Sequence, residues 1–152
     1  MVNVFFLSPI YHLLSTDFVQ WGSKCEYTGG GVEGRVQDFK DLNVWKKSHR
    51  LVLAVYRITS SFPRSENFGL ISQMRRSAVS IAANIAEGFR KRGKKDKINF
   101  YNISQGSLDE LEYYLILAVD LKYCEKEEVV VSLVGEIGRM LGALINSIEE
   151  RL

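Results

Sequence analysis

Apolar residues recur at spacings of three, four or seven from Asp38 onward, which is typical of helices with one buried face. Only two prolines occur, Pro9 and Pro63, so the long C-terminal part contains no strong helix breaker. We therefore expect an all-α fold, an antiparallel up-down-up-down four-helix bundle with helices of about 20 to 28 residues. The four expected apolar stripes are Trp45, Val52, Val55, Thr59 and Phe62; Ile71, Met74, Ala78, Ile81 and Ile85; Tyr101, Ser104, Leu108, Leu111, Leu115 and Ala118; and Val130, Leu133, Ile137, Leu141, Leu144 and Ile148.

Capping and turn residues predict where these helices begin and end. Asp41 is expected to cap the first helix, and Pro63 is expected in the connection that follows it, with Ser65 or Asn67 capping the second helix. Gly88 and the cations after it are expected at the end of the second helix. Gly93 is expected to separate the second helix from the third, with Asp96 in the first turn of the third. The third helix also carries a second apolar face, formed by Phe100, Ile103, Tyr114, Leu117 and Leu121. A helix that is apolar on two faces has to be covered on both.

The first 37 residues differ from the rest. They mix aromatic and apolar residues without a clear period and then run through "YTGGGVEG", a sequence typical of flexible linkers. We interpret residues 1–37 as a flexible N-terminal extension and residues 38–152 as the bundle domain. An upstream reading extension and a strand that docks elsewhere are the alternatives.

Targeting and redox signals favour a cytoplasmic protein. The N-terminus lacks a basic region and a small-residue cleavage pattern, and Pro9 interrupts its apolar run, so a signal peptide is not expected. No later apolar run approaches the ~20 residues that span a bilayer. Cys25 and Cys124 lie far apart without a Cys-x-x-Cys pattern, and His12 and His49 are isolated, so we expect reduced thiols, no metal and no cofactor.

Charge is distributed unevenly along the chain. The net charge of +2 is too small to indicate a partner by itself. Between Arg75 and Lys97, however, eight lysines and arginines face two acids, whereas between Glu125 and Arg151 six acids face three bases. The chain is therefore polarised, with a basic middle and an acidic C-terminal part.

The basic middle holds the first candidate site, which we call the basic corner: Arg90, Lys91, Arg92, Lys94, Lys95 and Lys97. Lysines and arginines that neutralise phosphates release counterions and give affinity for nucleic acid without sequence selectivity. The alternative is that helix C-termini attract cations in any case and that loops are charged for solubility. The density of charge exceeds what one helix end requires, which favours nucleic-acid binding.

Arg75 and Arg76 are a second candidate, flanking the buried stripe of the second helix. They could contact phosphate, line a channel, or pair with Glu110 and Glu112 of the third helix, and a structural ion pair is the favoured interpretation.

A polar stripe on the second helix is the third candidate. It consists of Ser77, Ser80, Asn84 and Glu87. The alanines around it allow close helix approach, and Asn84 could fix the register through hydrogen bonds. We interpret the stripe as packing and assembly, because no nucleophile with a base and no metal set accompanies it. Five aromatic residues, Tyr101, Tyr113, Tyr114, Tyr123 and Phe100, could stack on bases, but their helical spacing favours core or interface positions, as it does for Trp45.

Three segments, in this order, resemble a known family: "DFKDLNVWKKSHRLVLAVYRITSSFP", "FGLISQMRRSAVSIAANIAEGFRKR" and "GSLDELEYYLILAVDL". They are similar to the four-helix bundle family of the 23S rRNA intervening-sequence proteins, once labelled ribosomal S23 proteins, which includes relatives of the accessory variability protein of diversity-generating retroelements. The resemblance implies a homopentamer around a central channel, with nucleic-acid binding in some members and no enzymatic activity. It leaves residues 1–37 without a counterpart. It also places Ala82 where many relatives have a proline, so that a kink expected there would be softened.

The sequence as a whole predicts a non-catalytic, cytoplasmic homo-oligomer, pentameric by resemblance. It would bind structured RNA or DNA through the basic corner, mainly at phosphates, with no membrane role. The alternative is a protein-interaction scaffold whose basic rim docks a nucleic-acid-processing enzyme such as a reverse transcriptase.

Overall fold

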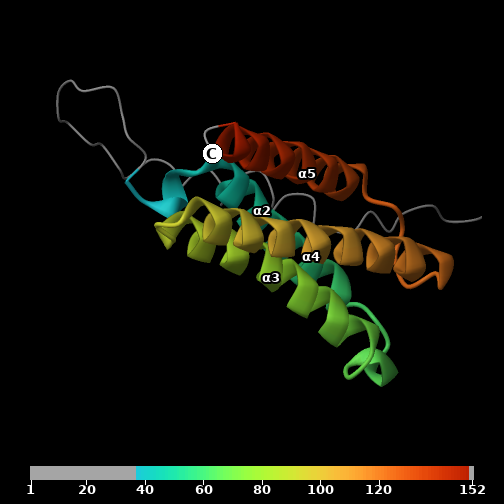
Figure 1. The fold of residues 1–152 in the computed structure, drawn as a ribbon. Coiled ribbons are helices and arrows are strands. Elements are labelled where there is room, and N and C mark those ends of the chain that lie inside the picture. Colours follow the sequence, from blue (N-terminus) through green and yellow to red (C-terminus); the bar gives the residue numbers. More distant parts are fainter. Residues whose placement is uncertain (1–36, 151–152) are drawn as a thin grey trace, which may run out of the picture. The chain divides into compact units, whose positions relative to one another are not determined.

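Four α-helices form the part of the chain that the computed structural model describes, residues 37–150 (Figure 1). They are α2 (Asn43–Thr59), α3 (Leu70–Arg90), α4 (Lys94–Asp120) and α5 (Glu128–Glu149), with two short 3₁₀ helices, η2 (Phe39–Asp41) and η3 (Arg64–Glu66). No strand occurs within these residues, so the all-α prediction is confirmed. At 17 residues α2 is shorter than expected, whereas α3, α4 and α5 fall in the expected range.

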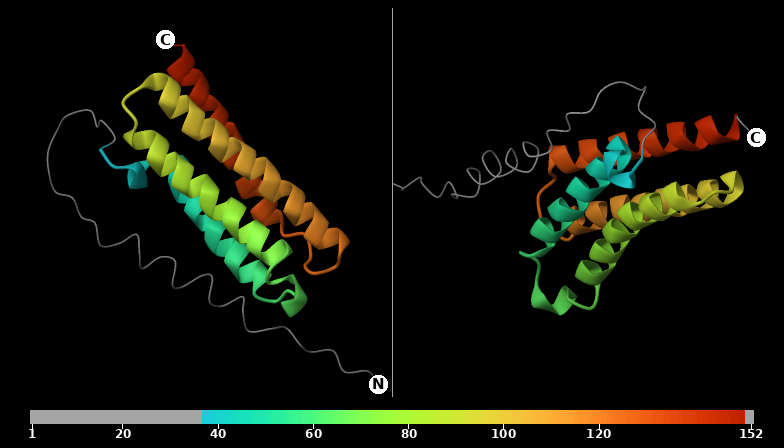
Figure 2. Two further views of the ribbon diagram at one scale, coloured as in Figure 1. Left: turned by 60° about the horizontal axis from the view of Figure 1, so that its bottom comes forward. Right: turned by 90° about the vertical axis from the view of Figure 1, so that its left-hand side faces the viewer.

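The helices are arranged as a four-cornered bundle (Figure 2). Each helix contacts the next one along the chain, and α5 closes the arrangement against α2; within residues 37–150 the diagonal pairs do not approach closely. Arg57 near the end of α2 donates to Glu127 just before α5, at 2.5 Å, and Lys47 near the start of α2 pairs with Glu136 in α5. Consecutive helices therefore run in opposite directions, and the α2–α3 and α4–α5 connections share one end of the bundle.

The predicted stripes of α3, α4 and α5 supply most of the core. All five stripe residues of α3 are buried, and five of six are buried in α4. In α2 most of the expected face is buried, including Leu51, Val55 and Thr59. Trp45 and Val52 of the expected stripe are half-buried, and Val44 and Ser48 are buried as well. Trp45 packs against the core as a half-buried side chain: its ring stacks on exposed His49 at 5.4 Å between centroids, and Phe39 meets its edge. Such a ring buries area while lying at the rim of the bundle.

Two predicted N-caps were wrong. Asp41 lies inside η2, and α2 starts after Leu42 without a side-chain cap; it is Asp38 that accepts from the backbone N–H of Lys40, at 3.1 Å. At the start of α3, neither Ser65 nor Asn67 caps the helix. Glu66 does so instead, because its carboxylate accepts from the backbone N–H of Leu70 at 3.1 Å. A longer side chain reaches a donor four residues on, which short-range cap rules do not anticipate.

Gly88 has a different role from the predicted helix stop. The α3 helix continues past it to Arg90 without interruption, including at Ala82, where a softened kink was expected. Gly88 is buried, and a Cβ at this position would lie 2.6 Å from Cε1 of Tyr101 in α4. Glycine is therefore required for close helix approach rather than for the helix end.

The α4 helix ends in a Schellman motif. The backbone N–H of Tyr123 donates to Ala118 and that of Lys122 donates to Val119, both at 2.9 Å. Lys122 adopts the left-handed conformation, with φ of 60°, at the position where glycine is usual. This turn directs the chain toward α5 and places Tyr123 against Phe62 of the α2–α3 connection, at 5.5 Å between ring centroids.

The predicted extension lies outside the described residues, apart from Gln37, and so does Cys25. Among the helices of residues 37–150, none combines the length and the apolar character that crossing a bilayer requires.

Candidate nucleic-acid interface

The basic corner lies where α3 ends and α4 begins, joined by Lys91, Arg92 and Gly93. Arg90, Arg92, Lys94 and Lys95 are exposed, whereas Lys91 and Lys97 are half-buried. The cations that follow Glu87 on α3 lie at the C-terminal end of that helix, where its dipole favours positive charge. Six cationic residues therefore lie at the α3–α4 junction, at one end of the bundle.

Two of these cations are held by contacts inside the chain. Lys91 Nζ lies 3.0 Å from a carboxylate oxygen of Glu87 and 4.5 Å from the ring centroid of Phe100. Lys97 Nζ lies 5.9 Å from the ring centroid of Phe89. These contacts span α3 and α4, so this pair of lysines stabilises the corner as well as contributing charge.

Three other cations have no such restraint. Arg90, Arg92 and Lys95 form no ion pair within residues 37–150 and extend into solvent. Guanidinium and ammonium groups that are exposed without carboxylate partners create a positive potential that attracts anions. Asp96, which is also exposed, is the acid closest in sequence to this group.

Arg75 and Arg76 lie away from the basic corner on α3, and the two side chains make different contacts. Arg75 Nε donates to Thr59 Oγ1 at 2.8 Å, and its guanidinium lies 4.7 Å from the ring centroid of Tyr56. Arg75 therefore ties α3 to α2. Arg76 is exposed and donates to Gln73 on its own helix, at 2.8 Å. Neither arginine forms the expected salt bridge with Glu110 or Glu112.

Glu110 is instead held by neutral hydroxyl donors. Ser77 Oγ donates to one of its carboxylate oxygens at 2.9 Å, and the Tyr114 hydroxyl donates to the other at 2.8 Å. These two hydrogen bonds, with a smaller contribution from the charge of Arg76, lower the pKa of Glu110. The hydrogen bond from the Tyr114 hydroxyl to Glu110 also raises the pKa of Tyr114, since an ionised phenol could not donate. Glu112 is exposed.

The polar stripe of α3 packs against α4. Ser80 Oγ and Ser107 Oγ share a hydrogen bond at 2.8 Å, and Asn84 donates to both the carbonyl and the hydroxyl of Ser80. Fully buried Ser104 donates across the interface to the carbonyl of Ile81, at 3.0 Å. These contacts are those of helix packing. No pattern in the sequence pointed to Ser107 as a partner, whereas Tyr114, four residues after Glu110, has the spacing of a helical pair.

Most of the aromatic residues considered for base stacking are engaged inside the bundle. Tyr101 is 2% exposed, and burial raises its pKa to about 12. Tyr114 and Tyr123 donate to Glu110 and Glu66, and Phe100 lies under Lys91. Tyr113, at 58% exposed, is the exception among these five.

Comparisons with known proteins agree with the four-helix fold. A family model described as "23S rRNA-intervening sequence protein" matches residues 40–143, which include all four helices up to Ala143. A crystal structure of a protein of unknown function from the S23 ribosomal protein family, from Bacteroides thetaiotaomicron VPI-5482, is similar with a TM-score of 0.62 and 28% sequence identity. The similarity covers 67% of this chain and 97% of that chain. No curated protein matches.

Proposed function

This chain belongs to the family of 23S rRNA-intervening sequence proteins, and we propose from that premise that it is a non-catalytic nucleic-acid-binding protein. In this proposal the protein acts as a homo-oligomer and contacts the phosphates of RNA or DNA through the basic corner. A pentamer is the stoichiometry expected from the family resemblance.

One observation carries the proposal: Arg90, Arg92 and Lys95 are exposed, lie close together along the chain and lack carboxylate partners within residues 37–150. A solvated helix end would require only one or two cations near the last carbonyls of α3. Lys91, which is paired with Glu87, already meets that requirement. The remaining charge is available for phosphate, and its affinity would be set by the number of counterions released.

Exposed apolar side chains on α4 support self-association. Ile103, Tyr113 and Ile116 on α4 and Leu121 directly after it are each between 44% and 58% exposed. An apolar surface of this kind on a single chain is typical of an interface. Assembly into a symmetric oligomer would also repeat the basic corner and multiply its charge.

The test is binding of the full-length protein to labelled RNA and duplex DNA across a salt series, with its oligomeric mass measured in the same buffers. We expect affinity to fall steeply with salt and to depend weakly on sequence. A variant with Arg90, Arg92 and Lys95 replaced by glutamine should bind more weakly at every salt concentration. For duplex DNA, the log–log salt slope should become shallower by about 0.9 for each phosphate that the variant no longer neutralises.

A matched variant separates local charge from net charge. Replacing Lys46, Lys122 and Arg139 by glutamine removes the same charge from exposed positions outside the basic corner. It should retain most of the affinity. Equal losses in the two variants would mean that only net charge matters. Absence of binding at ~0.15 M salt, the physiological ionic strength, would contradict the proposal and favour a scaffold that docks an acidic partner protein.

A further inference from the structure

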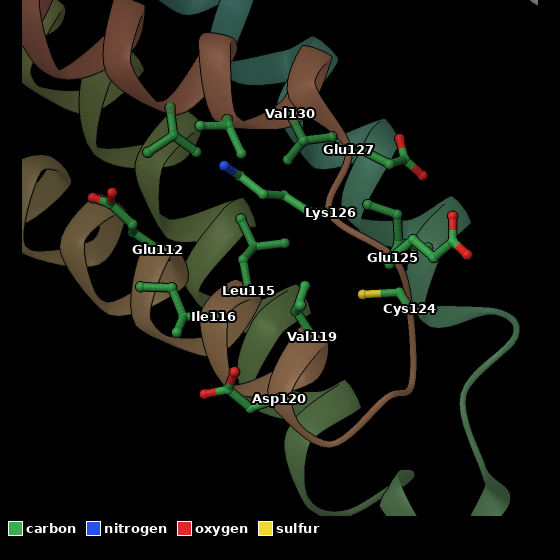
Figure 3. Close-up of a pocket in the computed structure, with 13 residues that line it drawn as sticks. Glu112, Leu115, Ile116, Val119, Asp120, Cys124, Glu125, Lys126, Glu127 and Val130 are labelled. Atoms are coloured by element: carbon green, nitrogen blue, oxygen red, sulfur yellow. The ribbon is translucent and has the colours of Figure 1, made fainter.

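An apolar groove opens between α4 and α5 at the end of the bundle farthest from the basic corner. It has a volume of about 360 Å³ and is lined mainly by Ile58, Leu115, Ile116, Val119, Val130 and Val134. Leu115 in the groove lies 21 residues after Lys94 on α4, and at 1.5 Å per residue this is about 30 Å along the helix from the basic corner. Figure 3 shows Leu115 and Val119 of α4 facing Val130 of α5, with the sulfur of Cys124 pointing toward the space between them.

The rim of this groove is acidic. Glu112, Asp120 and Glu125 lie around it and form no ion pair within residues 37–150. Two further charged residues of the rim are already paired, Glu127 with Arg57 and Lys126 with Glu128. Two residues that line the groove are themselves exposed, Ile116 at 56% and Val131 at 42%. The groove therefore fits an apolar group that is accompanied by positive charge.

The chain itself presents such a group. Phe68, in the connection between η3 and α3, is 97% exposed, although free phenylalanine surface in water is unfavourable. Arg64 in the same connection is exposed and forms no ion pair within the described residues. Leu53 and Tyr56 on α2 and Val79 on α3 are also exposed apolar side chains.

The connection that carries Phe68 is held in place. The carboxylate of Glu66 accepts from the backbone N–H of Leu70, at 3.1 Å, and from the hydroxyl of Tyr123, at 3.2 Å. Phe62 packs on the ring of Tyr123 from the same connection. A protruding side chain on a fixed loop loses little conformational freedom when it is bound, which is the property of a preorganised anchor.

The positions of Phe68 and the groove suit a head-to-tail contact between copies. Both lie at the same end of the bundle, because the α2–α3 and α4–α5 connections meet there. They lie on opposite edges, because α2–α3 and α4–α5 are opposite pairs in the four-cornered arrangement. Copies placed side by side with their helices in parallel would bring Phe68 of one to the groove of the next. Repetition of such a contact by rotation closes a ring.

We infer that Phe68 of one copy occupies the α4–α5 groove of a neighbouring copy, with Arg64 beside the acidic rim. This inference rests on the self-association in the proposed function and names the surfaces that produce it. It leaves the basic corner, at the other end of each chain, free to bind nucleic acid.

The test is a site-specific disulfide. A Phe68→Cys variant, with Cys25 replaced by serine, has thiols at position 68 and at Cys124 in the groove. If residue 68 enters the groove of the next copy, mild oxidation should produce a ladder of covalent oligomers on a non-reducing gel, ending at the ring size. Adding Cys124→Ser should abolish the ladder. A Ser72→Cys variant in the same background, which places the thiol four residues farther along the chain, in the first turn of α3, should cross-link much less.

A second variant measures the contribution of the aromatic ring. Phe68→Ala should keep the helical content of the protein, because the side chain makes no core contact, and should weaken assembly by about 30-fold, as for an interface hot spot. Asn67→Ala, an exposed neighbour, should assemble normally. Sedimentation over a range of protein concentrations measures both.

The outcomes separate this inference from the proposed function. An oligomer that Phe68→Ala leaves intact, or a disulfide that forms only within one chain, would overturn the inference but not nucleic-acid binding. A cross-linked ring that ignores nucleic acid would support the inference and contradict the proposed function. A wild-type protein that is monomeric at all concentrations would overturn the inference and assign the groove to a different partner.

Discussion

The two sides of α4 are packed in different ways. Toward α3 the contact is close and polar: Gly88 admits Tyr101, and Ser77, Ser80 and Ser104 form hydrogen bonds across the interface. Toward α5 the contact is aliphatic and more open. A Cβ at Gly138 would reach Leu108 at an ordinary 3.5 Å, a Cβ at Gly142 would meet nothing within 4 Å, and the groove opens near the helix end.

The difference shows how one helix can serve two purposes. Directional hydrogen bonds and close backbone approach determine the register of α3 and α4, which positions the basic corner at their junction. Aliphatic contacts fill space without fixing a single partner, and the incomplete filling on the α5 side leaves apolar surface exposed. The close side of α4 thus supports the proposed nucleic-acid surface, and the open side supports the proposed assembly surface.

The same substitution should have opposite effects on the two sides. Gly88→Ala places a methyl group against the ring of buried Tyr101, so we expect a loss of about 1–3 kcal/mol in the free energy of unfolding. Gly142→Ala lies within α5 with space around it, so we expect a gain of about 0.5–1 kcal/mol from helix propensity. Urea unfolding at fixed protein concentration measures both. A stable Gly88→Ala variant would show that the α3–α4 contact is less tight than described.

The polar side should also be sensitive to pH. Hydrogen bonds from Tyr114 and Ser77 lower the pKa of Glu110 in the folded protein, so the ionised form contributes stability. That contribution is complete above the unfolded pKa of about 4.3 and is lost as pH falls through the lower folded value. Glu110→Gln should therefore cost about 1 kcal/mol at pH 7 and progressively less below about pH 4.

Glu112→Gln is the matched control for this prediction, because Glu112 is exposed on the same helix. It should change the free energy of unfolding by no more than about 0.5 kcal/mol at any pH. The measurement is the unfolding midpoint in urea at several pH values between 3 and 7. Parallel pH profiles for wild type and Glu110→Gln would rule out the assigned role of Glu110.

A weaker effect is expected at the turn that leads into the open side. Lys122 has a φ of 60°, a conformation that favours glycine. Lys122→Gly should raise the free energy of unfolding by about 0.5 kcal/mol, since relief of the left-handed strain slightly exceeds the added chain entropy. Lys122→Ala removes the same charge without the relief and should not be stabilising. Thermal unfolding of the pair distinguishes the backbone effect from the charge effect, and equal melting temperatures would contradict it.

The helices and most of their buried faces could be predicted from the amino-acid sequence alone. Stripes at helical spacing, such as Ile71 to Ile85 in α3, are local properties, because side chains three and four apart share a face whatever the helix packs against. The clustering of cations between Arg90 and Lys97 was also readable, since a helix end and a short connection keep neighbours in the sequence close in space. The three family-like segments led to the same fold.

The residues that meet across helices became known only from the packed bundle. Glu66 rather than Ser65 caps α3, Arg75 contacts Tyr56 and Thr59 rather than Glu110, and Gly88 admits Tyr101 rather than ending a helix. Each of these contacts depends on the rotation and spacing of two helices, and a period along one chain carries no information about either. The groove and the exposed Phe68 follow from the same cause, because what a bundle leaves unfilled or uncovered is known only when all four helices are in place.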